Sequence, residues 1–328
     1  MAKKHENYDV VIIGGGSAGL TAGIYCGRSR LKTLIIEQAL VGGLITSTED
    51  LENYPGFPNG VGGEELMNLF YEQAKNYGVD FKFTNVKEVD FSEDEKIVET
   101  FRNVYHAKAV IIATGVKPRP IGCEGETQLI GKGISFCSTC DANLCIDKEV
   151  YVIGGGDSAV EEAMYLTKFA DKVSIIHRRD ELRAAKSIQE KAFKCDKLEF
   201  IWDTVVTEIK GENCVESMTI ENVKTGEKTT ITPREGDDNF IIFPYVGLDP
   251  VTQVFEGKIK LENGFIKTNE DMETNVPGVL AAGDVRVKSL RQVITAAADG
   301  AIAAISAENH INALLYKESE KEKEKSLA

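Results

Sequence analysis

The chain has 328 residues, of which 42% are hydrophobic and 27% charged, a composition and length that suit two globular domains. Its formal net charge of -14 argues against nucleic-acid binding, because such surfaces are built from clustered Lys and Arg. No apolar run reaches the roughly 20 residues that span a bilayer, and the polar N-terminus lacks the hydrophobic core of a secretory signal. We therefore expect a cytoplasmic protein that does not associate with membranes.

One succession of strand, glycine loop, helix and strand occurs twice, with each landmark displaced by 140 positions. The first copy is predicted over residues 8–13, 14–19, 17–30 and 31–37, and the second over 149–153, 154–159, 158–170 and 172–177. Each copy is followed by short alternating segments and then by an apolar strand that ends in glycine. The pattern predicts an α/β protein with two Rossmann-like nucleotide-binding domains, each a three-layer ββα arrangement.

The second domain is predicted to be inserted into the first. Residues 275–284 and the Ala-rich helix after Arg291 have no counterpart after Gly115, so the first domain is expected to resume late in the chain. This reasoning gives a first domain of residues 1–117 and 246–328 and an inserted domain of residues 118–245. Residues 317–328, with their Glu and Lys repeats, are expected to form a disordered tail.

The first glycine loop predicts a dinucleotide site. Gly14 permits the tight turn, Gly16 lets backbone N–H groups approach a pyrophosphate, and Gly19 lets the helix pack closely on the strand. Glu37 ends the second strand, where a carboxylate would accept hydrogen bonds from ribose hydroxyls. This site therefore suits a dinucleotide with a free ribose 2′-position, such as FAD or NAD.

The second glycine loop, with Gly154, Gly156 and Ala159, is followed by a different charge pattern. His177 stands at the position equivalent to Glu37, and a basic cluster follows it. This cluster consists of Arg178, Arg179 and Arg183. Cations there would bind a 2′-phosphate, which favours NADPH over NADH. The alternative is a solvated basic turn without a ligand.

Cys137 and Cys140 form the one closely spaced cysteine pair and are followed by Asp141. Such a pair supports a redox-active disulfide, with Asp141 placed to move protons. The alternatives are half of a zinc site, for which no second pair of ligands is present, and two inert buried residues. We therefore expect no metal. The remaining cysteines are expected to behave as small hydrophobic residues; they are Cys26, Cys123, Cys145, Cys195 and Cys214.

Taken together, these motifs resemble the bacterial-type thioredoxin reductases, from Tyr8 to about His310. The similar segments also include residues 52–56, 112–115, 283–284 and 291–292. The resemblance implies FAD in the first domain and NADPH in the second. The implied FAD contacts are Gly14, Gly16, Ser17, Gly19, Glu37, Gly43, Asn53, Ala113, Thr114, Gly115, Gly283, Asp284, Arg291 and Gln292. The implied NADPH contacts are Gly154, Gly156, Asp157, Ser158, Ala159, His177, Arg178, Arg179 and Arg183.

The resemblance also implies roles for the dithiol and a mode of action. Cys137 would attack thioredoxin, Cys140 would face the flavin and Asp141 would donate a proton. The protein would be a homodimer whose inserted domain swings about pivots near Pro118 and Tyr245. Leu44 and Ala142 depart from the residues common in the family, which puts one flavin contact and the turn after the dithiol in doubt.

Three other functions compete with this one. A relative of the same fold could take electrons from ferredoxin, or oxidise a small-molecule dithiol with oxygen, but neither needs a 2′-phosphate site. A non-enzymatic nucleotide sensor would not need the dithiol. The basic cluster and the cysteine pair favour an NADPH-dependent thioredoxin reductase over all three.

Overall fold

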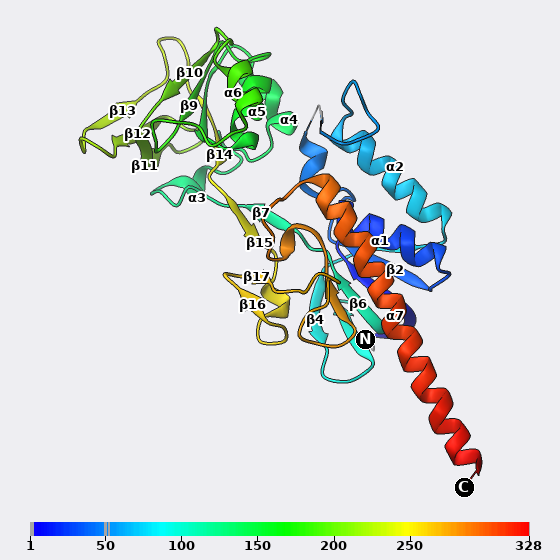
Figure 1. The fold of residues 1–328 in the computed structure, drawn as a ribbon. Helices are drawn as coiled ribbons and strands as arrows, with labels where there is room; N and C mark the ends of the chain where they lie inside the picture. Colours follow the sequence, from blue (N-terminus) through cyan, green and yellow to red (C-terminus); the bar gives the residue numbers. More distant parts are fainter. Residues whose placement is uncertain (1–2, 49–50, 52, 328) are drawn as a thin grey trace. The chain divides into compact units, whose positions relative to one another are not determined.

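The structure is a computed structural model that describes residues 3–48, 51 and 53–327; of residues 47, 139, 140, 322 and 324–327 it describes the backbone alone. The chain divides into two compact units, which Figure 1 shows and which we describe separately. Unit 1 consists of Met1–Lys117 and Pro250–Ala328, and unit 2 of Pro118–Asp249. The chain crosses between them in β7 (Val116–Pro118) and β15 (Leu248–Pro250), which form a two-stranded sheet.

Unit 1 is built on a seven-stranded sheet. The order is β3 (Asp80–Phe83), β2 (Thr33–Glu37), β1 (Lys4–Ile13), β6 (Asn103–Ile112), β5 (Lys96–Thr100) and β4 (Val86–Asp90), and β18 (Val279–Ala281) also pairs with β6. The strands β3, β2, β1, β6 and β18 are parallel, whereas β4 and β5 are antiparallel. In the parallel register Ile13 lies opposite both Ile36 and Ile112, so the carboxyl ends of the central strands meet at one edge.

Helices cover one face of this sheet. They are α1 (Ser17–Arg28), α2 (Gly63–Asn76) and α7 (Val293–Leu327). Along β1 the side chains alternate: Val10 and Ile12 join the core under the helices, and Val11 and Ile13 join the core on the other face. Both faces are apolar because both are covered, and each buried Val or Ile contributes about 1.5–3 kcal/mol.

The last segment of the chain differs from our prediction of a disordered tail. Helix α7 continues through Leu327, which Figure 1 shows as a long red helix ending at the C-terminus. Glu and Lys are good helix formers, and no Gly or Pro follows Gly300 to end the helix. Pairs such as Lys323 Nζ to Glu320 Oε1, at 3.0 Å, add support. The absence of an apolar stripe correctly indicated a solvated segment but does not prevent helix formation.

Unit 2 has three layers. A parallel four-stranded sheet has the order β10 (Leu198–Ile201), β9 (Lys172–Ile176), β8 (Glu149–Gly154) and β14 (Ile241–Tyr245). One face packs on α5 (Asp157–Leu166) and α6 (Lys186–Ala192), and the other on the antiparallel strands β11 (Thr204–Lys210), β12 (Ser217–Asn222) and β13 (Lys228–Ile231). Val150 and Val152 face the helices, whereas Tyr151 and Ile153 face the antiparallel sheet. The prediction of two Rossmann-like domains is confirmed.

Smaller elements complete both units. They are the hairpin β16 (Leu261–Glu262) and β17 (Phe265–Ile266), the short helices α3 (Glu126–Leu129) and α4 (Ser138–Asp141), and the 3-10 turns η1 (Gly43–Ser47), η2 (Ala142–Cys145), η3 (Gln253–Phe255) and η4 (Gly283–Val285). Among the described residues, no helix is both long and apolar enough to cross a bilayer.

Candidate active site

The first glycine loop leaves no space for side chains at two of its positions. Gly14 has a φ of 109°, and a Cβ there would lie 2.3 Å from the Ala113 backbone oxygen. At Gly19 a Cβ would lie 1.9 Å from the Gly14 oxygen. Helix α1 therefore begins in contact with the end of β1. Its first turn has neither a side-chain cap nor an acidic residue, so its N–H groups are available to an anion.

Glu37 lies beside this loop, at the end of β2. Its Oε2 accepts the Gly15 N–H at 2.7 Å, and its Oε1 accepts the Ala39 N–H at 3.1 Å. A carboxylate oxygen has two acceptor positions, so each can also accept a ribose hydroxyl. Glu37 thus fixes the backbone of the glycine loop at the end of β2.

Further predicted FAD residues gather at the same edge of the sheet. The Ala113 N–H donates to Ile13 at 2.8 Å, and Thr114 Oγ1 donates to the Val251 oxygen at 2.7 Å. Beside α1, Gly16 forms a bridge with Gly42, next to Gly43. The strands thus bring together loops that are distant in the sequence.

The turn η4 brings Asp284 to this edge, beside α1. A Cβ on Gly283 would lie 2.9 Å from the Ala18 Cβ, so η4 and the start of α1 are in contact. Asp284 Oδ1 is buried without a hydrogen-bond partner among the described residues. Burial raises the pKa of Asp284, the nearby Lys288 and Arg291 lower it, and Asp299 raises it. A hydroxyl or N–H group of a ligand could satisfy this buried acceptor.

The start of α7 adds two polar side chains. Gln292 Oε1 accepts from Asn53 Nδ2 at 3.1 Å, which joins two segments that the sequence analysis selected separately. Arg291 lies over the Phe265 ring at 4.3 Å, and its Nε donates to the Asp284 backbone oxygen at 3.3 Å. Both side chains are therefore held in place before any ligand binds.

The second glycine loop has a similar geometry in unit 2. A Cβ on Gly154 would lie 2.5 Å from the Tyr245 oxygen, and α5 begins at Asp157 without a side-chain cap. Asp157 Oδ1 instead accepts the Ala185 N–H at 2.7 Å. The next residues, Ser158 and Ala159, form the first turn of the helix. The N–H groups of this turn are likewise without a side-chain cap, although, unlike α1, α5 carries an acidic residue, Asp157, in its first turn.

His177 lies under this loop and is only 5% exposed. A Cβ on Gly155 would come within 2.5 Å of the His177 ring, so the loop rests on the imidazole. Burial lowers the pKa of His177, and Arg183, Arg179 and Arg178 lower it further. The ring is therefore neutral near pH 7, and its Nε2 has no partner among the described residues. The positive charge beside the second glycine loop therefore comes from Arg178, Arg179 and Arg183.

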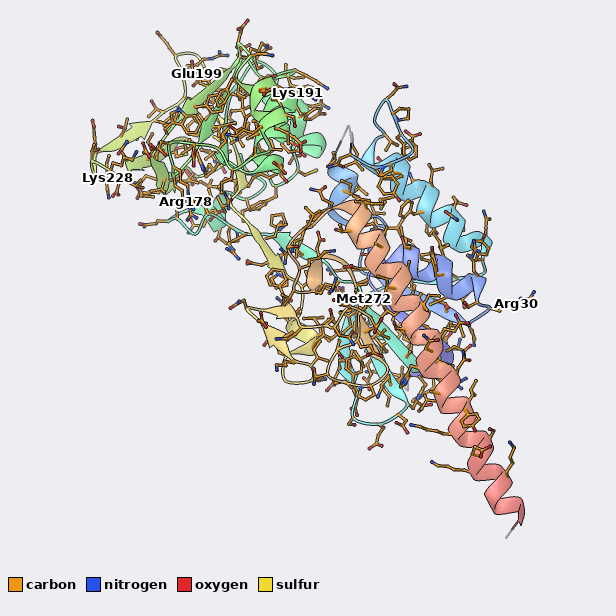
Figure 2. The ribbon with its side chains drawn as sticks, in the orientation of Figure 1. Arg30, Arg178, Lys191, Glu199, Lys228 and Met272 are labelled. Atoms are coloured by element: carbon orange, nitrogen blue, oxygen red, sulfur yellow. The ribbon has the colours of Figure 1, made fainter. Side chains whose placement is uncertain are left out.

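Arg178, Arg179 and Arg183 are exposed, and Figure 2 labels Arg178 just after β9. The neighbouring Asp180 is paired with Lys224, whose Nζ lies 2.9 Å from Asp180 Oδ2 and 3.0 Å from Asp203 Oδ2. With these acids engaged elsewhere, the guanidinium groups can bind an anion from solution.

The dithiol turn lies in α4. Cys137 is disulfide-bonded, and the other cysteines outside the pair are free. The side chain of Cys140 lies outside the described part of the structure. The Asp141 N–H donates to the Cys137 oxygen at 3.2 Å, which closes the turn.

Ser135 connects the dithiol turn to Asp141. Its Oγ donates to Asp141 Oδ2 at 2.5 Å and accepts the Cys137 N–H at 3.1 Å. Ser135 is 8% exposed, so the serine end of both bonds is largely shielded from water. The sequence analysis did not select Ser135. A hydroxyl two positions before Cys137 could have indicated a hydrogen-bond partner for the dithiol turn.

Another missed group surrounds Asp299, on the second turn of α7. Its carboxylate accepts from Arg286 Nη1 at 3.0 Å, Lys288 Nζ at 2.8 Å and the Gly283 N–H at 3.0 Å. This ion cluster fixes η4 and therefore the position of Asp284. No spacing in the sequence links these residues, because the fold brings them together.

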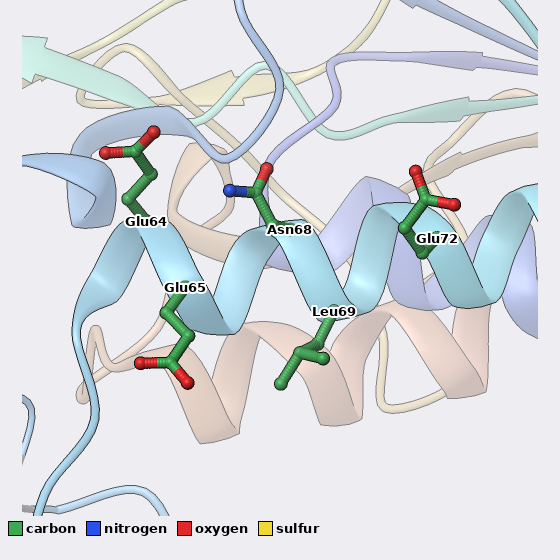
Figure 3. A pocket seen from close by; sticks show the side chains of 5 residues that line it. All are labelled: Glu64, Glu65, Asn68, Leu69 and Glu72. Atoms are coloured by element: carbon green, nitrogen blue, oxygen red, sulfur yellow. The ribbon is translucent and has the colours of Figure 1, made fainter.

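A surface hollow lies away from all these residues, on the outer side of α2 (Figure 3). It is lined by Glu64, Glu65, Asn68, Leu69 and Glu72. These carboxylates would repel a nucleotide phosphate. The hollow is therefore unsuited to either dinucleotide.

Comparison with known proteins agrees with this geometry. Residues 8–300 match the family described as pyridine nucleotide-disulphide oxidoreductase. The chain belongs to this family. Thioredoxin reductase from Peptoclostridium litorale is 53% identical over 308 residues, covering 94% of this chain and 98% of that one. Thioredoxin reductase from Bacillus subtilis (strain 168) is 46% identical over 309 residues, covering 94% and 96%.

A solved structure extends the match to three dimensions. Thioredoxin reductase from Lactococcus lactis shares 44% identity with a TM-score of 0.89, covering 93% of this chain and 99% of that one. Within the family, the chain therefore belongs to the thioredoxin reductases. The resemblance inferred from the motifs is confirmed.

Proposed function

We propose that this thioredoxin reductase takes electrons from NADPH and delivers them, through FAD in unit 1 and the Cys137/Cys140 pair in unit 2, to oxidised thioredoxin. The observation that carries the proposal is the disulfide at Cys137, which Ser135 links to Asp141, in the unit whose glycine loop lies beside the arginines. The redox pair and the basic cluster that would bind a 2′-phosphate thus occur in one domain. Neither a ferredoxin-dependent enzyme nor a nucleotide sensor requires this combination.

Unit 1 fits FAD at several points. The uncapped N–H groups of α1 would bind the pyrophosphate, and Glu37 would accept from the adenosine ribose. The unpartnered Oδ1 of Asp284 suits a ribityl hydroxyl. Asn53 and Gln292 would offer donors and acceptors to the polar part of the ring. FAD, when bound, accepts a hydride from nicotinamide and passes two electrons to a disulfide.

Unit 2 fits NADPH. The first turn of α5 would bind the pyrophosphate, and Arg178, Arg179 and Arg183 would bind the 2′-phosphate. The neutral His177 would support the loop from below through Gly155. Selection of NADPH over NADH then depends on the arginines alone.

The reduced pair would act on thioredoxin by thiol–disulfide exchange. The Cys137 thiolate would attack one sulfur of the thioredoxin disulfide, forming a mixed disulfide and releasing the other sulfur as a thiolate. Cys140 would then attack Cys137, restore the intramolecular disulfide and release the second thioredoxin sulfur. Asp141, oriented by Ser135, would supply a proton to a departing sulfur and recover it from solvent.

The test uses the full chain loaded with FAD. NADPH, NADH or reduced ferredoxin is added with oxidised thioredoxin, and the free thiols formed are counted. Cys137→Ser should abolish thioredoxin reduction while NADPH still bleaches the yellow colour, and Cys214→Ser, which changes a free cysteine, should leave both unaffected. Full thioredoxin reduction by Cys137→Ser, or a preference for NADH or ferredoxin, would overturn the proposal.

We also propose a cytoplasmic homodimer. Helix α7 carries the exposed apolar side chains Ile294, Ile302 and Ile305, which a second copy would cover. Sedimentation should give about twice the 35.9 kDa mass of the chain, and the variant Ile302→Lys/Ile305→Lys should sediment as a monomer. A monomeric wild type would contradict this assignment.

A further inference from the structure

A second carboxyl group, besides Asp141, lies against the dithiol turn. It belongs to Glu162 on α5, which packs on α4. The hydroxyl of Ser138, the residue after Cys137, donates to Glu162 Oε2. Ser138 is fully buried and Glu162 is partly buried, so the serine end of this bond is shielded from water. The turn that carries the redox pair is thus tied on one side to Asp141 and on the other to Glu162.

The surroundings of Glu162 make it titrate near neutral pH. Burial raises the pKa of Glu162 to about 7, the Ser138 hydroxyl lowers it and Glu161 on the same helix raises it. From β14, Tyr245 also faces this site: it is hydrogen-bonded to Ser138, and burial and the Glu162 charge raise its pKa. Tyr245 therefore stays protonated and neutral. Glu162 changes charge in the range where thiols form thiolates.

Covalent geometry limits the distance between this charge and the sulfur. Adjacent Cα atoms are about 3.8 Å apart, so the Glu162 carboxyl lies at most about 12 Å from Cys137 Sγ. At an effective dielectric constant of about 20, two like charges at that distance shift each other's pKa by about one unit. An ionised Glu162 therefore opposes formation of a thiolate.

We propose that Glu162 is a positioning residue of the redox pair: through Ser138 it fixes the turn, and its change of charge makes the acidity of the reduced thiols depend on pH around neutrality. The inference rests on the proposed function, because it takes Cys137 as the attacking thiol. In the reduced enzyme below pH 7 the neutral carboxyl would favour the Cys137 thiolate. Above pH 7 the carboxylate would oppose it, and the thiol would keep its proton longer.

The experiment measures the acidity of Cys137 directly. The FAD-loaded enzyme is reduced with dithiothreitol, the reductant is removed, and the rate at which iodoacetamide alkylates Cys137 is followed by peptide mass between pH 5.5 and 9. Glu162→Gln keeps the shape and the hydrogen-bonding capacity but removes the charge. We expect it to lower the apparent pKa of Cys137 by about one unit and to speed alkylation at pH 7.5 by several-fold.

Two further variants separate charge from structure. Glu162→Asp keeps the carboxylate and should retain the wild-type pH profile, and Glu190→Gln, at an exposed carboxylate on α6, should match the wild type. If Glu162→Gln has the wild-type profile, or if Glu162→Asp behaves like Glu162→Gln, the inference is wrong. Thioredoxin reduction by the same wild-type preparation distinguishes this failure from a failure of the proposed function.

Discussion

Replacing Gly19 with alanine should weaken FAD binding by roughly a hundredfold. The new Cβ would lie 1.9 Å from the Gly14 oxygen, whereas real Cβ atoms keep at least 3.0 Å, so α1 must move away from β1 by about 1.1 Å. Hydrogen bonds from the first turn to a pyrophosphate would then stretch from about 2.9 Å to about 4 Å. Bonds to a charged group contribute about 1.5–3 kcal/mol each, so losing one or two costs about 3 kcal/mol.

The assay is calorimetric titration of FAD into the apoenzyme, with the ratio of flavin to protein absorbance as a check. The second loop offers a matched control, because Ala159 occupies the position equivalent to Gly19. Ala159→Gly should leave FAD binding unchanged, since it lies in the other unit. If Gly19→Ala binds FAD within threefold of the wild type, α1 does not hold the pyrophosphate in the way we argue.

Three further predictions follow from the site. The double variant Arg178→Ala/Arg179→Ala should raise the KM for NADPH about 100-fold, because each exposed guanidinium contributes roughly 1.4 kcal/mol to 2′-phosphate binding. The KM for NADH should stay unchanged. Equal changes in the KM for NADPH and for NADH would refute 2′-phosphate binding. Ser135→Ala should lower kcat for thioredoxin reduction about tenfold without altering the KM for NADPH, because Asp141 loses its hydrogen bond, and an unchanged kcat would remove Ser135 from the mechanism. Glu162 has a raised pKa in the folded state, so its ionisation lowers the stability of the wild type as the pH rises from about 4.5 to about 7. In urea unfolding, Glu162→Gln should be more stable than the wild type by about 1–3 kcal/mol at pH 8 and equally stable at pH 4. Equal stability at pH 8 would contradict the burial of this charge.

The sequence by itself determined the duplicated architecture and most of the chemistry. The hydrophobic periods of strands and helices can be read from neighbouring residues, and a glycine loop between a strand and a helix forms a tight turn. The spacing of Gly14, Gly19 and Gly154 was therefore enough to predict the two glycine loops. The adjacent residues of the dithiol turn and of the basic cluster are also local signals. The chemistry of the dithiol follows from residue type and spacing, and that of the basic cluster from residue type and from its position at the end of β9.

The tertiary structure alone decided which distant residues meet and which of them are charged. Asn53 reaches Gln292, and Glu162 on α5 reaches Ser138 on α4, because the fold brings together segments that are apart in the sequence. The burial that leaves His177 neutral likewise depends on the packing of Gly155 over its ring. Desolvation and hydrogen bonding act through space, so no pattern of neighbouring residues could have predicted them.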